Sequence, residues 1–488
     1  MPAWTRCPTN LVLMHNCLKI GELLLMIARN LLLTGDKHDL LSFVLTCHIF
    51  LGPGLDVLWE KIDSPHLLLS IFPGNSISLT RSIVSGAVEE DNKDDEQDNE
   101  DDEQDNEDDE EDNEDDEEDT EDYEDDECYL QYKYDIHGIP APEVWTRLLF
   151  YSRRIREISY KSDYCQPFLA QILSNKPSDV NLFPILQKLS WKSKSKEDWP
   201  SLSIFLSPSL SSLTVFCPAV DQALNLSTIP GCLPNLRRFK LKHPELTLGY
   251  PQFELIGNAL LSFKRLTYLN LNFPSISIAM DFRVLISLSQ IPNLTELALG
   301  LSVKYFNYPE IVLVDGFRSL EVLRLIWWDK TSTATVIALL KTIPLFSLPK
   351  LEEVFLTGFY IAFTASLLET MAVSWPQLTT LIVNQLCQLD EPQVDILHLQ
   401  PLATHCHHLK ELLIPFISPH ITLDTIPPST IRPTSTERLC IFENWTKVSN
   451  HFIAIAILHA MFGVFHMLLE NEGCCGKLGL AAKEFMVT

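Results

Sequence analysis

The sequence predicts an α/β fold: a solenoid with a curved parallel sheet and helices on its convex side, preceded by a small domain of three helices. Three observations lead to this prediction. A short leucine pattern recurs along residues 186–414, an amphipathic segment covers residues 20–62, and a highly acidic segment covers residues 89–127. Each observation indicates a different part of the chain.

The leucine pattern reads Leu-x-x-Leu-x-Leu with conservative exchanges, as in residues 266–271. Its last two apolar residues are two positions apart, so they point to the same side of a short strand. A weaker copy begins at Ile155, and residues 439–441 continue the series. The clear copies begin at Leu186, Leu210, Leu236, Leu266, Leu294, Leu320, Leu351, Leu378 and Leu409. They resemble leucine-rich repeats, in which each copy adds one strand to a parallel sheet.

The copies depart from the usual repeat at the eighth position after the first Leu. The family usually has Asn or Cys there, whereas this chain has residues such as Lys194, Pro218 and Trp328. No asparagine ladder can form, so the resemblance is to the irregular intracellular repeats. Helices on the convex side are expected at residues 253–263 and 335–342.

The segment from Ile20 to Ile62 places apolar residues at helical spacing. Its Glu-Leu-Leu, Asp-Leu-Leu, Val-x-x-Cys and Leu-Trp motifs resemble the F-box, a three-helix module that binds the Skp-type adaptor of cullin-RING ubiquitin ligases. The family's opening Leu-Pro is replaced by Lys19-Ile20. The resemblance implies adaptor contacts through Ile20, Glu22, Leu23, Leu24, Ile27, Leu31, Leu40, Leu41, Val44, Cys47, Leu58 and Trp59. The alternative is a helical cap that only closes the solenoid core.

An F-box followed by leucine-rich repeats resembles ligase substrate receptors, in particular a divergent family carried by many fungi. The resemblance implies a Skp-type adaptor, a cullin-RING ligase and an unknown protein substrate as partners. Outward strand positions would contact the substrate on the concave face, through Lys188, Lys192, Arg238, Lys240, Lys242, Tyr268, Asn270, Arg324, Ile326, Phe355, Ile382 and Leu413. A second hypothesis is a scaffold without an adaptor, whose acidic segment binds basic proteins.

The expected domains follow from these features. They are a tail over residues 1–17, the F-box-like domain over 18–66, a linker over 67–88, the acidic segment over 89–127, the solenoid over 128–445, and a C-terminal capping helix with a tail over 446–488. The uncharged run 451–469 is also long enough to span a bilayer, but a helix covering the end of the solenoid core accounts for the same residues.

No catalytic motif is recognisable, so we expect a protein that is not an enzyme and that binds no cofactor, nucleic acid or membrane. His405, Cys406, His407 and His408 are adjacent, whereas zinc ligands normally come as spaced pairs, so no metal site is expected there. The cysteines lack Cys-x-x-Cys spacing, and no cleavable signal peptide is recognisable. A cytoplasmic or nuclear location is therefore expected.

The acidic segment contains 30 Asp or Glu and one Lys, a charge of −29. The whole chain has a net charge of −28, so the remainder carries +1. A seven-residue unit recurs in the segment, but it has no apolar seam, and this density of like charge predicts a disordered chain. A tolerated insertion explains the segment, whereas the alternative hypothesis is that it covers the basic end of the concave face.

This hypothesis predicts that deletion of residues 89–127 raises the affinity of the chain for acidic ligands at low salt. The reason is that the deletion removes an intramolecular competitor whose attraction is screened by salt. Titration of an acidic peptide against both chains would measure the difference, and equal affinities would contradict the hypothesis.

Overall fold

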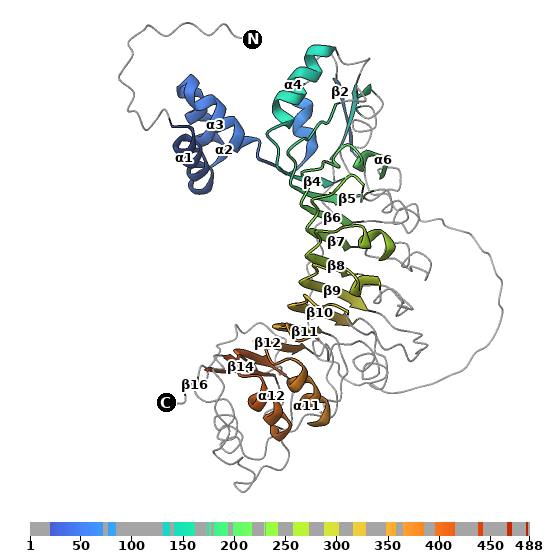
Figure 1. Ribbon diagram of the computed structural model, residues 1–488. Helices are drawn as coiled ribbons and strands as arrows, with labels where there is room; N and C mark the ends of the chain where they lie inside the picture. The colour runs from blue at the N-terminus through green and yellow to red at the C-terminus, as the bar shows by residue number, and fades with distance from the viewer. Residues whose placement is uncertain are drawn as a thin grey trace, which may run out of the picture.

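The structure, a computed structural model, describes the chain from residue 20 onward in segments. These are residues 20–71, 77–83, 130–136, 141–161, 180–193, 199–216, 231–242, 257–272, 287–301, 316–327, 348–357, 365–384, 396–414, 438–442, 466–470 and 485–486, with single positions at 172, 175, 176 and 229. They form a leucine-rich repeat solenoid built on one sheet of 14 strands (Figure 1). The predicted fold class is confirmed.

The strands follow each other along the sheet in chain order, and every neighbouring pair is parallel except the last. Each leucine pattern supplies one strand, including the weak copy at Ile155 and the continuation at residues 439–441. The strands are β1 (Lys61–Ile62), β4 (Glu157–Lys161), β5 (Lys188–Lys192), β6 (Ser212–Phe216), β7 (Arg238–Lys242), β8 (Tyr268–Asn272), β9 (Glu296–Leu301), β10 (Val322–Trp327), β11 (Glu353–Thr357), β12 (Thr380–Asn384), β13 (Glu411–Leu413), β14 (Arg438–Phe442), β15 (His466–Glu470) and β16 (Phe485–Met486).

The solenoid core is made by the leucine pattern itself. In each repeat from β4 to β12, the residue that opens the pattern and the two inward residues of the strand are buried at 2% exposure or less. Strand pairing aligns equivalent positions, so Leu241 lies beside Leu271, and Leu269 beside Leu297. Burial of continuous rows of side chains provides the main stabilisation of such an array.

A second regular feature is a ladder of backbone carbonyls just before the strands. The carbonyl of Gln187 accepts hydrogen bonds from the N–H groups of Ser211 and Ser212, both at 2.9 Å. Equivalent pairs of bonds reach the carbonyls of Glu60, Arg156, Ser211, Arg237, Thr267, Thr295, Glu321, Glu352 and Thr379. Each repeat therefore positions the start of the next strand.

Polar side chains that precede the first Leu of a repeat take over the bridging role of the missing asparagine ladder. The amide of Asn235 donates to the carbonyl of Pro208, and that of Asn293 donates to the carbonyl of Lys264, both at 2.9 Å. The Ser209 hydroxyl is within 2.8 Å of the Leu186 carbonyl. These bonds link successive repeats outside the sheet, and they lie one residue before the pattern that the sequence analysis used.

The N-terminal end of the solenoid has its own cover. Helix α4 (Pro142–Ser152) and the 3-10 helix η2 (Pro65–Ile71) contribute Val144, Trp145 and Leu148, among others, to the solenoid core. Behind them Tyr160 stacks on Trp191, with ring centroids 3.8 Å apart. The end of the sheet is thus closed without the three-helix domain.

The three-helix domain consists of α1 (Gly21–Thr34), α2 (Lys37–Thr46) and α3 (His48–Leu58). Its buried residues, including Ala28, Leu40 and Val44, form a cluster separate from the solenoid core. Gly54 on α3 lies so close to α2 that a Cβ atom there would be 2.0 Å from a methyl group of Val44. Figure 1 shows these helices at the N-terminal end of the solenoid, to one side of α4.

Strands β2 (Ile77–Ile83) and β3 (Leu130–Ile136) form an antiparallel hairpin outside the large sheet. Ile83 pairs with Leu130, so residues 84–129, which include the acidic segment, connect two adjacent strand ends. The predicted boundaries need correction here: β1 joins the large sheet from within residues 18–66, and the expected linker 67–88 contains most of η2 and the whole of β2.

Helices on the other side of the sheet are short. Among the described residues they include α6 (Trp199–Leu202), α11 (Ala365–Ser374), the 3-10 helix η8 (Ile396–Leu399) and α12 (Gln400–His405). Of the helix expected at 253–263, residues 257–261 are helical and 262–263 are not. Residues 253–256 and the helix expected at 335–342 lie outside the described residues.

The prediction of a C-terminal capping helix is wrong for the part of residues 446–488 that the structure describes. Residues 466–469 belong to β15, which pairs with β14 and with β16, so the sheet continues where a helix was expected. The short apolar run Met467–Leu469 fits a strand as well as a helix. The rest of the run, 451–465, lies outside the described residues. Within the described segments, no helix has the length and apolar character to cross a bilayer.

Replacing Leu269 with Ala tests the stabilising role of the buried rows. Leu269 is fully buried between equivalent residues of two neighbouring strands, so we expect a loss of about 2–5 kcal/mol in unfolding free energy. Urea unfolding followed by circular dichroism would measure it. Val373→Ala on α11, at a side chain that is 58% exposed, is the control and should change stability by about 0.5 kcal/mol or less.

Cys406 provides a test of core packing near the C-terminal end of α12. Its Sγ lies 3.7 Å from the carbonyl oxygen of Trp375, and burial raises the pKa of the thiol to about 12. The thiol therefore stays neutral at pH 8, and maleimide should label the exposed Cys232 but not Cys406 in the folded chain. Peptide mass spectrometry would show the difference, and equal labelling would contradict the packing.

Candidate functional site

The concave face of the sheet is formed by alternate residues of each strand. On β7 the inward residues Phe239 and Leu241 are buried, whereas Arg238, Lys240 and Lys242 face outward. The residues that the sequence analysis assigned to a target lie at such outward positions on β5, β7, β8 and β10–β13. Parallel register places outward residues of neighbouring strands side by side.

Five cations gather at one end of this face, and we call them the basic cluster. They are Lys188, Lys192, Arg238, Lys240 and Lys242. The first two lie on β5 and the others on β7, while β6 between them presents the neutral residues Ser212, Thr214 and Phe216. No outward position of β5, β6 or β7 carries a carboxylate.

Two aromatic rings lie beneath these cations. The Nζ atoms of Lys192 and Lys242 are 6.0 Å and 5.1 Å from the centroid of the Phe216 ring. The Arg238 guanidinium is 4.4 Å from the centroid of the Tyr268 ring, whose hydroxyl accepts a hydrogen bond from Asn270 at 3.2 Å. Cation–π contacts of this kind hold long cationic side chains in place at the surface. Phe216 was missed by the sequence analysis, although its position in the third outward row could have identified it.

The cations of β7 are close enough to affect each other. The pKa of Lys242 is lowered, mainly by partial burial and then by the positive charge of Lys240. Nearby carboxylates are already engaged: Glu157 pairs with Lys61 at 3.2 Å and with Lys188 at 3.5 Å. Most of the positive charge of the cluster therefore has no ion-pair partner among the described outward residues.

The face changes character toward the other end. Arg324 pairs with Glu296 at 3.5 Å and with Glu353 at 3.6 Å, and its guanidinium is 4.7 Å from the centroid of the Phe355 ring. Its charge is thus balanced on the protein. Beyond it the central outward row is apolar and half-buried, with Phe355, Ile382 and Leu413 on successive strands.

The three-helix domain separates the predicted adaptor residues into two groups. Leu24, Leu40 and Val44 are buried inside the domain. The prediction that they contact an adaptor directly is therefore wrong. Trp59 packs against the solenoid core, with its ring centroid 4.8 Å from that of Tyr151. Its side chain is therefore used in contacts within the protein. The exposed residues are Ile20, Glu22, Leu23, Ile27 and Leu41, and those of intermediate exposure are Leu31, Cys47 and Leu58.

Further apolar side chains of this domain are exposed without having been predicted. Met26 and Leu45 are 59% and 56% exposed, and Ile49 is also exposed. Leu45 lies one turn beyond Leu41 on α2, and both follow directly after buried residues. We call Ile20, Leu23, Met26, Ile27, Leu41, Leu45 and Ile49 the apolar surface set. The sequence signal for this exposed set is that the helices carry more apolar residues than so small a core can bury.

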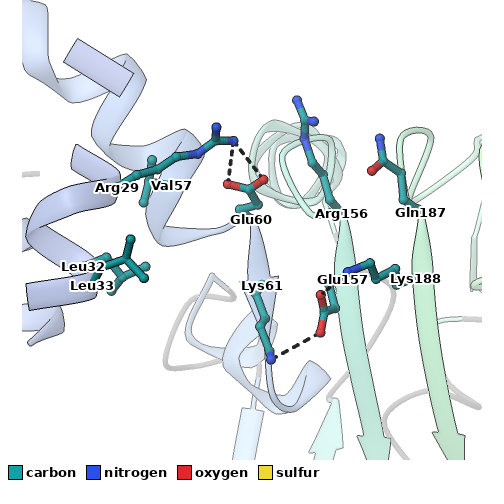
Figure 2. A pocket seen from close by; sticks show the side chains of 10 residues that line it. All are labelled: Arg29, Leu32, Leu33, Val57, Glu60, Lys61, Arg156, Glu157, Gln187 and Lys188. Carbon is teal, nitrogen blue, oxygen red and sulfur yellow. Dashed lines mark hydrogen bonds and ion pairs between the residues drawn. The ribbon is translucent and has the colours of Figure 1, made fainter. Parts of the chain in front are cut away.

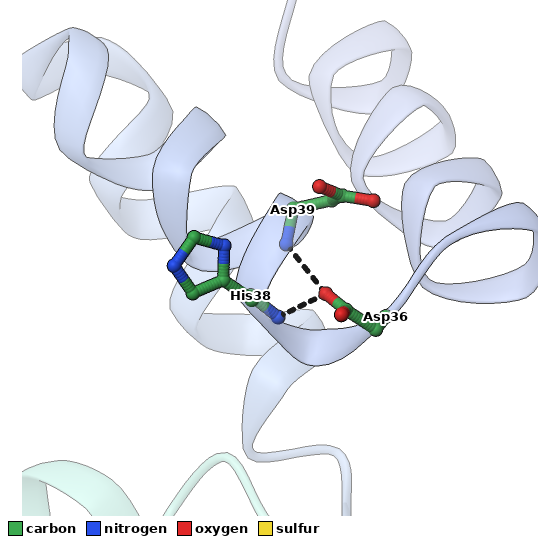
Figure 3. Close-up of side chains that lie close together, drawn as sticks. All are labelled: Asp36, His38 and Asp39. Carbon is green, nitrogen blue, oxygen red and sulfur yellow. Dashed lines mark hydrogen bonds between the residues drawn. The ribbon is translucent and has the colours of Figure 1, made fainter.

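Asp36, His38 and Asp39 bring their side chains close together at the start of α2 (Figure 3). The Asp36 carboxylate accepts hydrogen bonds from the backbone N–H groups of His38 at 2.7 Å and Asp39 at 2.9 Å. This is helix N-capping, which accounts for Asp36 without a metal ion. Near the other end of the chain, Cys406 is buried while His405, His407 and His408 are exposed, so their side chains do not converge.

A pocket of about 340 Å³ lies between α1 and the first strands (Figure 2). Arg29 reaches from α1 and donates to both carboxylate oxygens of Glu60 at 3.1 Å. Leu32 and Leu33 line the helical side, and Arg156 and Lys188 line the other. The Arg29–Glu60 pair ties the three-helix domain to the segment that leads into β1, so the pocket marks the junction between the two parts.

Comparison with known proteins gives the following findings. No protein-family model and no curated protein matches the sequence. Among solved structures, the chain is similar to one in the crystal structure of the TLR13–ssRNA13 complex, with 14% identity and a TM-score of 0.35 over 65% of this chain and 54% of that one. It is also similar to a chain in the Rad7 and Elc1 complex of yeast, with 15% identity and a TM-score of 0.30 over 59% of this chain and 84% of that one. The chain thus spans about half the length of the first of these structures.

Proposed function

We propose that this chain is the substrate-recognition subunit of a cullin-RING ubiquitin ligase. Helices α1–α3 bind a Skp-type adaptor, and the concave face binds a protein target. The observation that carries the proposal is that the three-helix domain has a core of its own and still exposes the apolar surface set.

Burial explains why this observation favours docking over capping. A cap would place its apolar residues against the solenoid core, but α4 and η2 already occupy that position. Exposed apolar area costs roughly 25 cal/mol for each Å² that a partner could cover. The apolar surface set is therefore suited to a second protein.

The residues that reach the surface favour contact through α1 and α2. Ile20, Leu23 and Ile27 are spaced so that they share one side of α1, next to the buried Leu24 and Ala28. Leu41 and Leu45 form a similar stripe on α2. A partner that covers these stripes would extend the small core of the domain.

The proposed role requires no catalytic group and no cofactor in this chain. A receptor brings its target near the ubiquitin-charged enzyme, so it contributes effective concentration and geometry. The Arg29–Glu60 pair and the packing of Trp59 would help fix the direction in which the solenoid presents its target. We place this activity in the cytoplasm or the nucleus.

Co-expression with a Skp-type adaptor, followed by pull-down, tests the proposal. The test variant is Leu23→Asp combined with Leu41→Asp, because both side chains are exposed and the domain core is left intact. We expect binding to weaken roughly thirtyfold, since an interface anchor contributes about 2 kcal/mol or more. Circular dichroism would verify that the variant remains folded.

Val373→Asp provides the control for introducing a charge at an exposed apolar position, because Val373 is 58% exposed and lies on α11, outside the three-helix domain. It should bind like the unmodified chain. If the unmodified chain fails to bind the adaptor, the proposal is wrong, and a scaffold whose acidic segment binds basic proteins becomes the better hypothesis.

A further inference from the structure

The concave face differs in charge along its length, and this difference specifies a class of ligand. The basic cluster occupies β5 and β7, with a neutral strand between. Neighbouring strands lie about 4.8 Å apart, so the two rows of cations face each other across roughly 10 Å. An extended chain that crosses the strands passes over both β5 and β7, so its anionic side chains come within reach of the cations on each strand.

The cations of the basic cluster are held at the surface with their charges available to an anionic ligand. Contacts with the Phe216 and Tyr268 rings hold Lys192, Lys242 and Arg238 at the surface without neutralising them. The lowered pKa of Lys242 reflects in part the repulsion from Lys240. A carboxylate bound between the two lysines would relieve that repulsion, and charge-assisted hydrogen bonds would hold it.

The apolar half of the face excludes a ligand of uniform charge. A nucleic acid that continued along the sheet would pass Glu296, Glu353 and Glu411, which would repel its phosphates. It would also meet the apolar row formed by Phe355 and Ile382. A polypeptide can change from acidic to apolar along its length, so it can match both halves.

The spacing between the halves sets the length of the motif. From β7 to β11 there are four strand intervals, about 19 Å. An extended polypeptide covers about 3.3 Å per residue, so roughly six residues separate the acidic part from the apolar part.

We propose that the concave face binds an extended segment of a partner protein in which a run of carboxylates is followed or preceded, about six residues away, by apolar side chains. The basic cluster holds the carboxylates, and Phe355, Ile382 and Leu413 contact the apolar side chains. The segment would belong to the ligase target, so this inference rests on the proposed function and defines the class of substrate.

Fluorescence anisotropy with a labelled synthetic peptide tests the inference on the full chain. The probe carries four Glu residues, a spacer of about six Gly and Ser residues, and a Leu-Phe-Leu end. A second probe of the same composition has the spacer moved to one end. We expect the first probe to bind roughly tenfold more tightly, because only it can reach both halves of the face.

Charge-reversal variants locate the binding. Lys240→Glu with Lys242→Glu should weaken the probe at least about tenfold, because two attractive charges become repulsive. Lys264→Glu with Lys350→Glu, at exposed positions outside the strands, is the matched control and should leave affinity unchanged. Phe355→Ser should weaken this probe but not a probe that contains only the acidic part.

Each contrary outcome overturns the inference. A chain lacking residues 89–127 is measured in parallel, because the acidic segment could compete with the probe. A probe with the same parts in reverse order is measured as well, and absence of binding of both probes to both chains is decisive against the proposal. Equal loss in the control variant, or tighter binding of oligouridylate through Lys240 and Lys242, would also refute it. Adaptor pull-down with the same variants separates the two proposals, because these substitutions lie outside α1–α3.

Discussion

The pairing of each strand with the one before it is the constraint on which the rest of this molecule depends. One carbonyl per repeat, such as that of Gln187, accepts two N–H groups from the next repeat and fixes where the next strand begins. Because the bonds recur, every repeat inherits its register from its predecessor. The buried rows and the rows on the concave face are consequences of this single relation. A misplaced strand would expose Leu269 and its equivalents, so the core and the ladder enforce each other.

The same register determines which side chains lie next to each other on the concave face. It brings Lys192 and Lys242 to opposite sides of Phe216, although these residues are far apart in the sequence. It also places Arg324 between Glu296 and Glu353. One cation group is thus left available for a ligand while the other is neutralised within the protein. The distinction depends on which residues share a row across three strands, and composition alone would not reveal it.

Sequence reasoning could predict the solenoid because period and burial coincide: the leucines that recur are the leucines that fill the core. It could also predict which strand residues face outward. It could not separate Leu23 from Leu24, because one helical step decides between surface and core, and the packing of α2 on α1 sets that step. It missed the hairpin of β2 and β3 because two strands separated by a long acidic segment give no local pairing signal. The helix expected near His466 was wrong because an apolar run can satisfy either period.

The hairpin gives the acidic segment an unusual freedom in evolution. Because Ile83 and Leu130 already lie side by side, the length of the chain between them changes only the entropy of closing a loop. The charge density of the sequence predicts a flexible connection, for which this cost grows as the logarithm of length; on that expectation, residues 84–129 cost about 1.7 kcal/mol more than a connection of about seven residues. One additional seven-residue unit would add only about 0.1 kcal/mol. Slippage during DNA replication could therefore alter the number of units, and the total negative charge with it, while the fold is left nearly unaffected.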